Sequence, residues 1–496
     1  MKRYATFFVI AAMSIGLVFL LVSRERSKHD APAEVIEAKA LADGGADAAS
    51  DPSGSDGVVV ATDAAAKPVE KPLRVTVLGW EFAAAGTVLE PPSAVAAISP
   101  IELSPELSLD AVEARLARGG ADPLGADIAL MPLPAFVSSY ERLRALEPRA
   151  FLVVGFSRGR EEVRSRAGGL LKPPPGADEV KLVALGPDTA SDAMAQAAGS
   201  ESATMLGLFA LDLLAVAPSR VRFVAPGTAD AKAAPYAALV RGASDERPRA
   251  LSTVDASRLV PIVGVAPKSL IDRREAAVRE WSKSWMSGLA RAKGDVPGIA
   301  RRLSAKEGLP LAAGVGGAPD ALVLVERLGQ ADSAQLEQQS SLIGPLAKGA
   351  VTLETLTQRT WRLARAGGIT AAAAPEPLPI DARIVSAIAP PPKDSSSTPP
   401  VEGDAGVTFG RVPAGAVPLV AYRAPEGEHD KVAEQIAFIS GVFERAVFKV
   451  TAKGGEKAAK AIALASYDRG VSPSRLMTAP GEPQGAVAVV EVLSPP

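Results

Sequence analysis

The stretch RALSTVDASRLVPIVGVAPKSLIDRREAAVREWSKSWMSGLARAKG, residues 249–294, decides the fold class. It contains two short apolar runs, RALSTV (249–254) and VPIVGVAP (260–267), whose composition is typical of strands. Residues 272–294 follow with helical spacing, which brings these apolar residues close to one face: Ala277, Val278, Trp281, Trp285 and Leu289. Two strands followed by a long amphipathic helix predict a sheet that is covered by helices.

Strand and helix patterns also alternate upstream of this stretch. Strands are predicted at LRVTVLG (73–79), in ADIALMPLP (126–134) with its end at Pro132, and at FLVVGF (151–156), VKLVALG (180–186) and VRFVAP (221–226). Helices are predicted near 109–118, 137–146, 202–216 and 231–241, and downstream at 295–305, 320–328 and 353–366. Gly119 and Gly120 predict the end of the first helix. This alternation indicates the α/β class with parallel sheets.

The N-terminal segment, residues 1–30, is predicted to anchor the chain in a membrane. Residues 5–22, ATFFVIAAMSIGLVFLLV, carry no charge and are long enough to cross about 30 Å of hydrocarbon as a helix. A cleaved signal peptide is the alternative, but the run is longer than a typical signal-peptide core and charged residues follow it. Residues 31–72, rich in Ala, Asp, Gly, Ser and Pro, are predicted to be a disordered spacer.

The C-terminal region is predicted to hold a second linker and a small domain. Residues 371–406 include PPPKDSSSTPP (390–400), whose composition is typical of a linker. Residues 407–496 are predicted to form a β-α-β-α-β unit. Its predicted strands are VTFGRV (407–412), AVFKVTAKG (446–454) and AVAVVEVL (486–493), and its predicted helices are 430–444 and 456–469.

Composition excludes several classes of function. The chain has no cysteine, so disulfides, thiolate metal sites and cysteine nucleophiles are excluded. Its two histidines, His29 and His429, argue against a histidine-based catalytic triad or a multi-histidine metal site. Lys and Arg number 54 against 56 Asp and Glu, so no basic excess points to nucleic acid. We therefore expect no enzyme, no metal and no cofactor.

Residues 73–345 resemble the type II periplasmic solute-binding proteins of ABC transporters. The branch they resemble most is the alkanesulfonate, nitrate, taurine and thiamine-pyrimidine group. Two stretches carry the resemblance, GADIALMPLPAFV (125–137) and the longer run from 249 to 304 that contains the opening stretch. The resemblance implies a two-lobed fold over residues 73–370, hinge closure over a solute, and an ABC permease as partner. It also implies a location in the periplasm, on the outer side of the cytoplasmic membrane.

Residues 407–496 resemble the peptidoglycan-binding domain of outer-membrane-protein-A-like proteins. GVSPSRLMTAPGEPQGAVAVVEVL (470–493) carries this resemblance. That family binds peptidoglycan through an Asp in the turn after the central strand and an Arg on the following helix. Here the turn reads TAKGG (451–455) and the helix reads EKAAKAIALASYDRG (456–470), without that Asp or a helical Arg at the matching place. The unit is therefore a degenerate copy, and we do not expect it to bind peptidoglycan.

Candidate solute contacts follow the predicted strands, because ligands of α/β sheets bind beyond the carboxyl ends of strands. On this rule the candidates are Trp80, Glu81, Pro132, Ser157, Arg158, Thr189, Ser191, Thr253 and Asp255. GPDTASD (186–192) precedes a predicted helix, where hydroxyls and free N–H groups suit an anion. Three alternatives stay open: Thr189 or Ser191 only caps the helix, Arg158 is a surface residue, and Trp80 packs in the core.

The sequence thus predicts a membrane-anchored periplasmic protein that captures a small polar or anionic solute for an ABC transporter. The alternative is a structural or interaction protein of the cell envelope that uses a binding-protein scaffold and its C-terminal domain. The apolar residues MPLPAF (131–136) favour this alternative, because a polar ligand needs donors at that edge. An enzyme on the same scaffold is the least favoured of the three.

Overall fold

The computed structural model describes residues 71–88, 102–106, 108–168, 171, 179–185, 200–240, 243, 245–295, 297–299, 331–334, 336–344, 351–389, 407–424 and 429–496. Residues Lys67–Pro496 form one compact unit. The predicted anchor at 1–30, its span 5–22 and residues 31–70 of the predicted spacer lie outside the described residues, as do the predicted helix at 320–328 and most of that at 295–305. Among the residues that are described, no helix combines the length and apolarity needed to cross a membrane.

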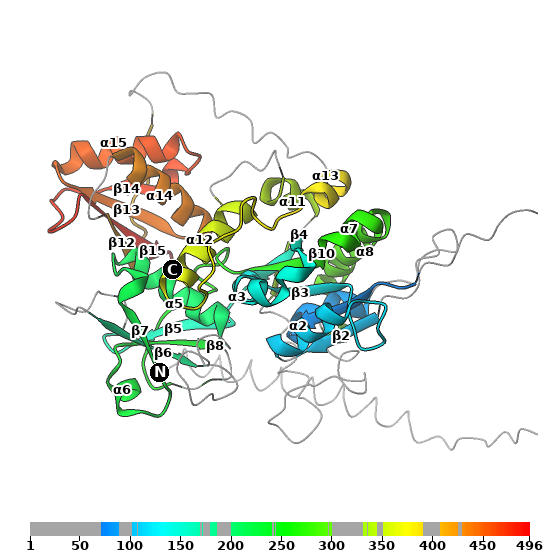
Figure 1. The fold of residues 1–496 in the computed structure, drawn as a ribbon. Coiled ribbons are helices and arrows are strands. Elements are labelled where there is room, and N and C mark those ends of the chain that lie inside the picture. Colours follow the sequence, from blue (N-terminus) through cyan, green and yellow to red (C-terminus); the bar gives the residue numbers. More distant parts are fainter. Residues whose placement is uncertain are drawn as a thin grey trace, which may run out of the picture. The chain divides into compact units, whose positions relative to one another are not determined.

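Sheet A is built from six strands in the order β11-β4-β10-β3-β1-β2. Four of them, β4, β10, β3 and β2, are labelled in Figure 1. The strands are β1 (Arg74–Leu78), β2 (Glu102–Glu106), β3 (Ile128–Pro132), β4 (Pro148–Ser157), β10 (Pro261–Pro267) and β11 (Ala331–Ser333). β1 pairs in parallel with β2 and β3, whereas β10 runs antiparallel to β3 and β4. β3 is buried along its whole length, because strands flank it and helices cover it.

Helices cover sheet A as the apolar spacing predicts. They are the 3₁₀ segments η1 (Trp80–Thr87) and η2 (Arg144–Leu146) and the helices α2 (Leu109–Arg118), α3 (Leu133–Leu143), α7 (Lys268–Arg273) and α8 (Glu275–Gly294). The Ser108 hydroxyl caps α2 by accepting from the Ala111 N–H, and Gly119 ends the helix at φ 74°. Trp281 and Trp285 of α8 are fully buried, and the Trp281 ring meets Phe151 of β4 edge-on at 6.0 Å.

Sheet B has five strands in the order β7-β6-β8-β5-β9. They are β5 (Glu161–Ser165), β6 (Val180–Leu185), β7 (Val221–Val224), β8 (Tyr236–Val240) and β9 (Arg249–Ser252). The long helix α5 (Glu201–Leu213) packs on this sheet, and the short segments η3 (Pro218–Arg220) and α6 (Ala229–Ala233) follow it. At Gly207 of α5 an added Cβ would lie 3.1 Å from the side chain of Leu182, so the glycine allows a close approach between helix and sheet.

Two sheets confirm the expected two-lobed α/β arrangement, but several details differ from the sequence predictions, among them the strands β2 and β11, which were not expected. Residues 231–241 are not a helix: α6 ends at Ala233 and β8 follows. This strand is buried throughout, so it shows no period-two alternation and its alanines suggest a helix. β5 was not expected, and both sheets are mixed, since β5 runs antiparallel to β8 and β9.

We call sheet A with its helices the first lobe, and sheet B with its helices the second lobe. Helix α12 (Leu353–Ala366) contacts α3 of the first lobe and α5 of the second (Figure 1). Its Thr352 cap forms a capping box with Thr355, which explains why the helix begins there. The Trp361 ring is buried, meets Tyr140 of α3 edge-on at 5.1 Å, and donates through its indole N–H to the Ala372 carbonyl at 3.1 Å. The helix therefore joins the two lobes by packing.

The chain then returns to sheet A. Helix α11 (Leu336–Leu342) precedes α12, and α13 (Arg383–Ile388) follows it and packs on α8 and β4. The Asp381 N–H donates to the Ala150 carbonyl at 2.9 Å, and Ile384 and Val385 are fully buried. Residues 371–389, which we expected in a linker, are therefore folded onto the first lobe. Apolar residues at 384, 385 and 388 are the sequence signal, and the surrounding prolines obscure it.

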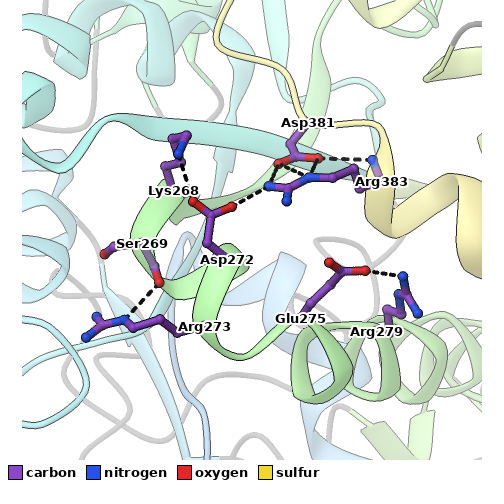
Figure 2. A network of polar contacts seen from close by, with 8 residues as sticks. All are labelled: Lys268, Ser269, Asp272, Arg273, Glu275, Arg279, Asp381 and Arg383. Atoms are coloured by element: carbon purple, nitrogen blue, oxygen red, sulfur yellow. Dashed lines mark hydrogen bonds and ion pairs between the residues drawn. The ribbon is translucent and has the colours of Figure 1, made fainter.

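A polar network at the surface fixes α13 beside α7, as Figure 2 shows. The Asp272 carboxylate accepts from the Lys268 ammonium at 2.7 Å and from the Arg383 guanidinium at 2.8 Å. Arg383 also pairs with Asp381 at 2.6 Å. Hydrogen bonds from Lys268 and Arg383 lower the pKa of the Asp272 carboxyl. The cations and carboxylates of this network pair with one another, so the network serves to position α13.

The C-terminal unit has a four-stranded sheet in the order β12-β15-β13-β14. Its elements are β12 (Val417–Ala424), α14 (His429–Val442), β13 (Val447–Ala452), α15 (Gly455–Tyr467), η4 (Pro473–Arg475), β14 (Leu476–Thr478) and β15 (Ala488–Ser494). The predicted first strand at 407–412 is wrong, and residues 417–424 take that role. Gly410 instead donates its N–H to the carbonyls of Pro473 and Leu476, both at 3.0 Å, beside η4.

Candidate functional site at the crossings between the two sheets

The chain crosses from one sheet to the other at two adjacent segments. The first crossing runs from Ser157, the end of β4, to Glu161, the start of β5. The second runs from the end of β9 at Ser252 to the start of β10 at Pro261. Two backbone hydrogen bonds join the crossings, from the Ser157 N–H to the Val260 carbonyl at 2.9 Å and from the Thr253 N–H to the Glu161 carbonyl at 3.0 Å.

A buried carboxylate lies where the two crossings meet. Glu161 is fully buried, and its Oε2 accepts from the hydroxyl of Ser157 and from the hydroxyl of Thr253 at 3.1 Å. The Thr253 Oγ1 in turn accepts from the Gly159 N–H at 2.8 Å. The structure thus brings together two of the predicted solute contacts, Ser157 and Thr253. Both hydroxyls are used to hold the crossings together.

Two other predicted contacts lie in the same crossings. Asp255 is half-buried, and its Oδ2 accepts from the N–H and the hydroxyl of Ser252, both at 3.0 Å, which closes a tight turn. Arg158 is half-buried in the first crossing. The next arginine, Arg160, places its guanidinium 5.4 Å from the centre of the Phe82 ring of η1. Arg158 and Asp255 therefore flank the network around Glu161.

The remaining predicted contacts are only partly described. Pro132 ends β3, pairs with Ile262 of β10 and is buried. It offers no N–H, so it can contribute only shape or its carbonyl oxygen. Trp80 and Glu81 begin η1 directly after β1, and the description covers their backbone but not their side chains. Thr189 and Ser191 lie outside the described residues.

Charged residues from both lobes gather near the start of α5. Arg142 of α3 donates through Nε to Glu113 of α2 at 2.6 Å, and this bond raises the pKa of Arg142. Glu201, the first residue of α5, lies in the same electrostatic environment. Burial raises the pKa of the Glu201 carboxyl to about 7, against the attraction of Arg160 and Arg142. This carboxyl therefore titrates near neutral pH between the lobes.

Sequence reasoning missed Glu161, Glu201 and Arg142. Glu161 lies in EEVRS (161–165), whose single apolar residue is Val163, so the sequence shows no apolar alternation that would indicate β5. A glutamate is also ordinarily a surface residue. In the sequence, Glu201 is an acidic residue at the start of a predicted helix, where a negative charge is ordinarily favourable. Its position in the sequence does not indicate that it is partly buried.

The C-terminal unit contacts the second crossing directly. Arg258 donates its N–H to the Val442 carbonyl at 3.2 Å, and its Nε lies 2.8 Å from Glu444 Oε1. The same guanidinium lies 4.4 Å from the centre of the Phe156 ring, at the end of β4. Phe443 also stacks on Phe209 of α5 with centroids 6.3 Å apart. A change in the angle between the lobes would therefore strain or rearrange contacts with the C-terminal unit.

Two pockets are lined by described residues. One, of about 950 Å³, lies at sheet B and α6 and includes Arg166, Lys232 and Arg247. The Arg247 guanidinium already forms an ion pair with Asp245 and donates to the Ala234 carbonyl at 3.1 Å. The other, of about 690 Å³, lies where α5 and α12 meet β12 and α14. Both have the size of small-molecule sites. No group of His, Asp or Glu among the described residues is arranged to hold a metal ion.

No protein-family model and no curated relative matches this sequence. Solved structures do show a similar fold. The chain is similar to the periplasmic aliphatic sulphonate binding protein SsuA from Escherichia coli, with 13% identity, a TM-score of 0.40, and coverage of 69% of this chain and 97% of that one.

The ligand-binding component of an ABC-type import system from Staphylococcus aureus is similar at 11% identity and a TM-score of 0.38, with coverage of 64% of this chain and 99% of that one. The desulfurization enzyme DSZB is similar at 11% identity and a TM-score of 0.35, covering 63% of this chain and 98% of that one.

Proposed function

We propose that this chain is a solute-binding protein whose two lobes close over a small polar or anionic solute. One observation carries the proposal: two adjacent crossings join sheets A and B, and the buried Glu161 holds them side by side through Ser157 and Thr253. Paired crossings of this kind let two lobes bend about one line, as in hinged binding proteins. Large lobe motions need only small dihedral changes in residues 157–161 and 252–261.

The solute would lie beyond the carboxyl ends of the strands, near the crossings. Arg158 is the cation proposed to attract an anionic group, and Asp255 the carboxylate proposed to accept from a solute donor. Trp80, Glu81, Thr189 and Ser191 remain proposed contacts. Ser157 and Thr253 act differently in this proposal, because their hydroxyls bond to Glu161 and determine the position of the crossings.

The proposed setting is the outer face of the cytoplasmic membrane. The uncharged run at residues 5–22 supports a single-pass anchor, and the spacer after it would let the lobes stand away from the lipid. An ABC permease is the proposed partner for the captured solute. We propose no catalytic role for Ser157, because its hydroxyl donates to Glu161 and the one histidine in the described part of the chain, His429, begins α14 in the C-terminal unit.

Thermal unfolding of the full chain in detergent, followed by calorimetry, tests this proposal. Sulfonates, phosphonates, nitrate, phosphate and pyrimidines would be added one at a time. A ligand at about 100 times its Kd stabilises the native state by about 2.7 kcal/mol, which is readily seen as a rise in Tm. We expect at least one of these solutes to raise Tm, and Arg158→Gln to weaken that effect.

Arg249→Gln is the matched control, because Arg249 is an exposed arginine at the start of β9. It should leave the ligand-induced rise in Tm unchanged. The absence of a rise with every solute would contradict the proposal. Capture of an envelope protein by the full chain would then favour the alternative of a structural or interaction protein.

A further inference from the structure

The pocket of about 690 Å³ at the junction with the C-terminal unit is strongly charged. Two of its walls are α5 and α12, and the others are β12 and α14. Its charged lining residues are Asp212, Arg359, Arg362, Arg423, Lys431 and Glu434. Four cations face two carboxylates, which leaves a surplus of two positive charges.

Pairing within the pocket does not remove this surplus. Arg362 holds Asp212 in a two-pronged ion pair, with nitrogen–oxygen distances of 3.2 and 2.6 Å. Arg423 donates to the Gln484 carbonyl at 2.7 Å, a neutral acceptor. Lys431 is exposed on α14, and no described carboxylate lies within ion-pair distance of its ammonium. Glu434, also exposed, is the remaining carboxylate.

Arg359 is the central residue of the pocket. It is half-buried, donates to Gln435 Oε1 at 2.8 Å, and lies 3.7 Å from the centre of the Phe438 ring. No described carboxylate pairs with it, although a guanidinium has five N–H donors. Burial lowers the pKa of Arg359, and the nearby Arg362 lowers it further. Asp212 and Glu434 act in the opposite direction without restoring the usual pKa. A desolvated cation that has no paired carboxylate is unfavourable, and an anion in the pocket would relieve that cost.

We propose that this pocket binds a small molecule with at least two anionic groups, phosphate or carboxylate, and that Arg359 is its main partner. A planar guanidinium matches such oxyanions with two parallel hydrogen bonds. Arg423 and Lys431 supply further positive charge, and Tyr422 and Gln358 supply neutral polar groups. The volume lies within the range of about 300–1,000 Å³ usual for small-molecule sites, which favours more than a single inorganic ion.

The position of the pocket gives the bound anion a second effect. Arg359 and Arg362 belong to α12, whereas Arg423 and Lys431 belong to the C-terminal unit. An anion between them would offset their mutual repulsion and strengthen the docking of the C-terminal unit. The site is separate from the crossings between the two sheets and does not depend on the proposed solute-binding function.

Isothermal titration calorimetry of the full chain with pyrophosphate and, separately, with citrate tests the proposal and distinguishes phosphate from carboxylate chemistry. At about 150 mM salt, where exposed charges are screened, we expect at least one of the two to bind with a Kd below about 1 mM. Arg359→Gln should weaken that binding by about tenfold or more, and Arg359→Lys should restore it only in part, because lysine lacks the planar fork.

Arg365→Gln is the matched control, since Arg365 is exposed on the same helix and does not line the pocket. It should bind like the wild type, and circular dichroism should show that all variants are folded. The proposal is overturned if neither anion binds, if Arg359→Gln binds as tightly as the wild type, or if Arg365→Gln weakens binding equally. Anion binding that survives in Arg158→Gln supports a site separate from the crossings, even if no solute is found there.

Discussion

The buried Glu161 and the half-buried Arg359 have opposite kinds of surroundings. Glu161, at the crossings between the sheets, is surrounded by hydroxyl donors of its own chain, with Thr253 at 3.1 Å. Arg359, at the junction with the C-terminal unit, is held by an amide oxygen and an aromatic ring and opens onto a pocket. The first charge has its partners built into the fold. The second has donors left over, so the comparison sets a structural charge against one that we propose binds a ligand.

Removal of Glu161 should have the largest effect on stability. Glu161→Ala leaves two buried hydroxyls without their acceptor and opens a cavity, so we expect a loss of about 2–4 kcal/mol in the free energy of unfolding. Urea unfolding followed by circular dichroism measures it. Glu162→Ala is the control, because Glu162 is half-buried and not fully buried, and it pairs with the half-buried Arg164 at 2.9 Å. A loss as small as the control's would show that Glu161 is not structural.

A third charged residue, Glu201, should make the free energy of unfolding depend on pH. Its folded pKa of about 7 is above its usual value of 4.5, so the folded state binds more protons between these values and loses stability as pH rises through them. Glu201→Gln should therefore be more stable than the wild type at pH 8, by about 1–3 kcal/mol, and equal to it near pH 4. Urea unfolding at both pH values measures the difference. If Glu201→Gln and the wild type were equally stable at pH 8, the raised pKa would be contradicted.

The contact between Arg258 and Glu444 should contribute less to the free energy of unfolding than Glu161 or Glu201 does. Arg258 is half-buried and Glu444 is exposed, with a nitrogen–oxygen distance of 2.8 Å, and the guanidinium also lies over Phe156. We expect Arg258→Ala to lower the free energy of unfolding by about 1 kcal/mol. It should also make the C-terminal unit more accessible to limited proteolysis. Arg445→Ala, at an exposed neighbour of Glu444, should change neither quantity.

The polar network around Asp272 in Figure 2 should have the smallest effect on stability. Asp272 is exposed to solvent, so its ion pairs with Lys268 and Arg383 are screened. Because these partners lower its pKa, their contribution is present above the unfolded pKa and is lost as pH falls through the folded one. Asp272→Asn should lower Tm slightly at pH 7 and not at all at pH 2. A large loss at pH 7 would mean that α13 depends on this network.

The sequence predicts most of the fold because most of its strands are short apolar runs bounded by turn residues. β1, β4, β6 and β10 are all found in this way. β8 is missed because a strand buried on both faces shows no alternation, and its alanines favour a helix. The short β11 and β14 depend on tertiary pairing that no local pattern reveals.

The candidate site is predicted only in part. The rule that ligands lie beyond strand ends finds Ser157 and Thr253, because both residues follow apolar strands. It cannot show that both hydroxyls donate to the Glu161 carboxylate, because Thr253 and Glu161 lie 92 residues apart in the sequence. The pocket around Arg359 is also beyond sequence reasoning, since α12 and α14 meet only in the folded chain.

The placement of the aromatic residues has a practical consequence for fluorescence. All four tryptophans of the chain lie with sheet A or on α12: Trp80 in η1, Trp281 and Trp285 in α8, and Trp361. The indoles of α8 lie 5.2 Å apart, close enough to share excitation energy. Emission will therefore report on the first lobe and α12, while sheet B and the C-terminal unit can melt without an indole signal of their own.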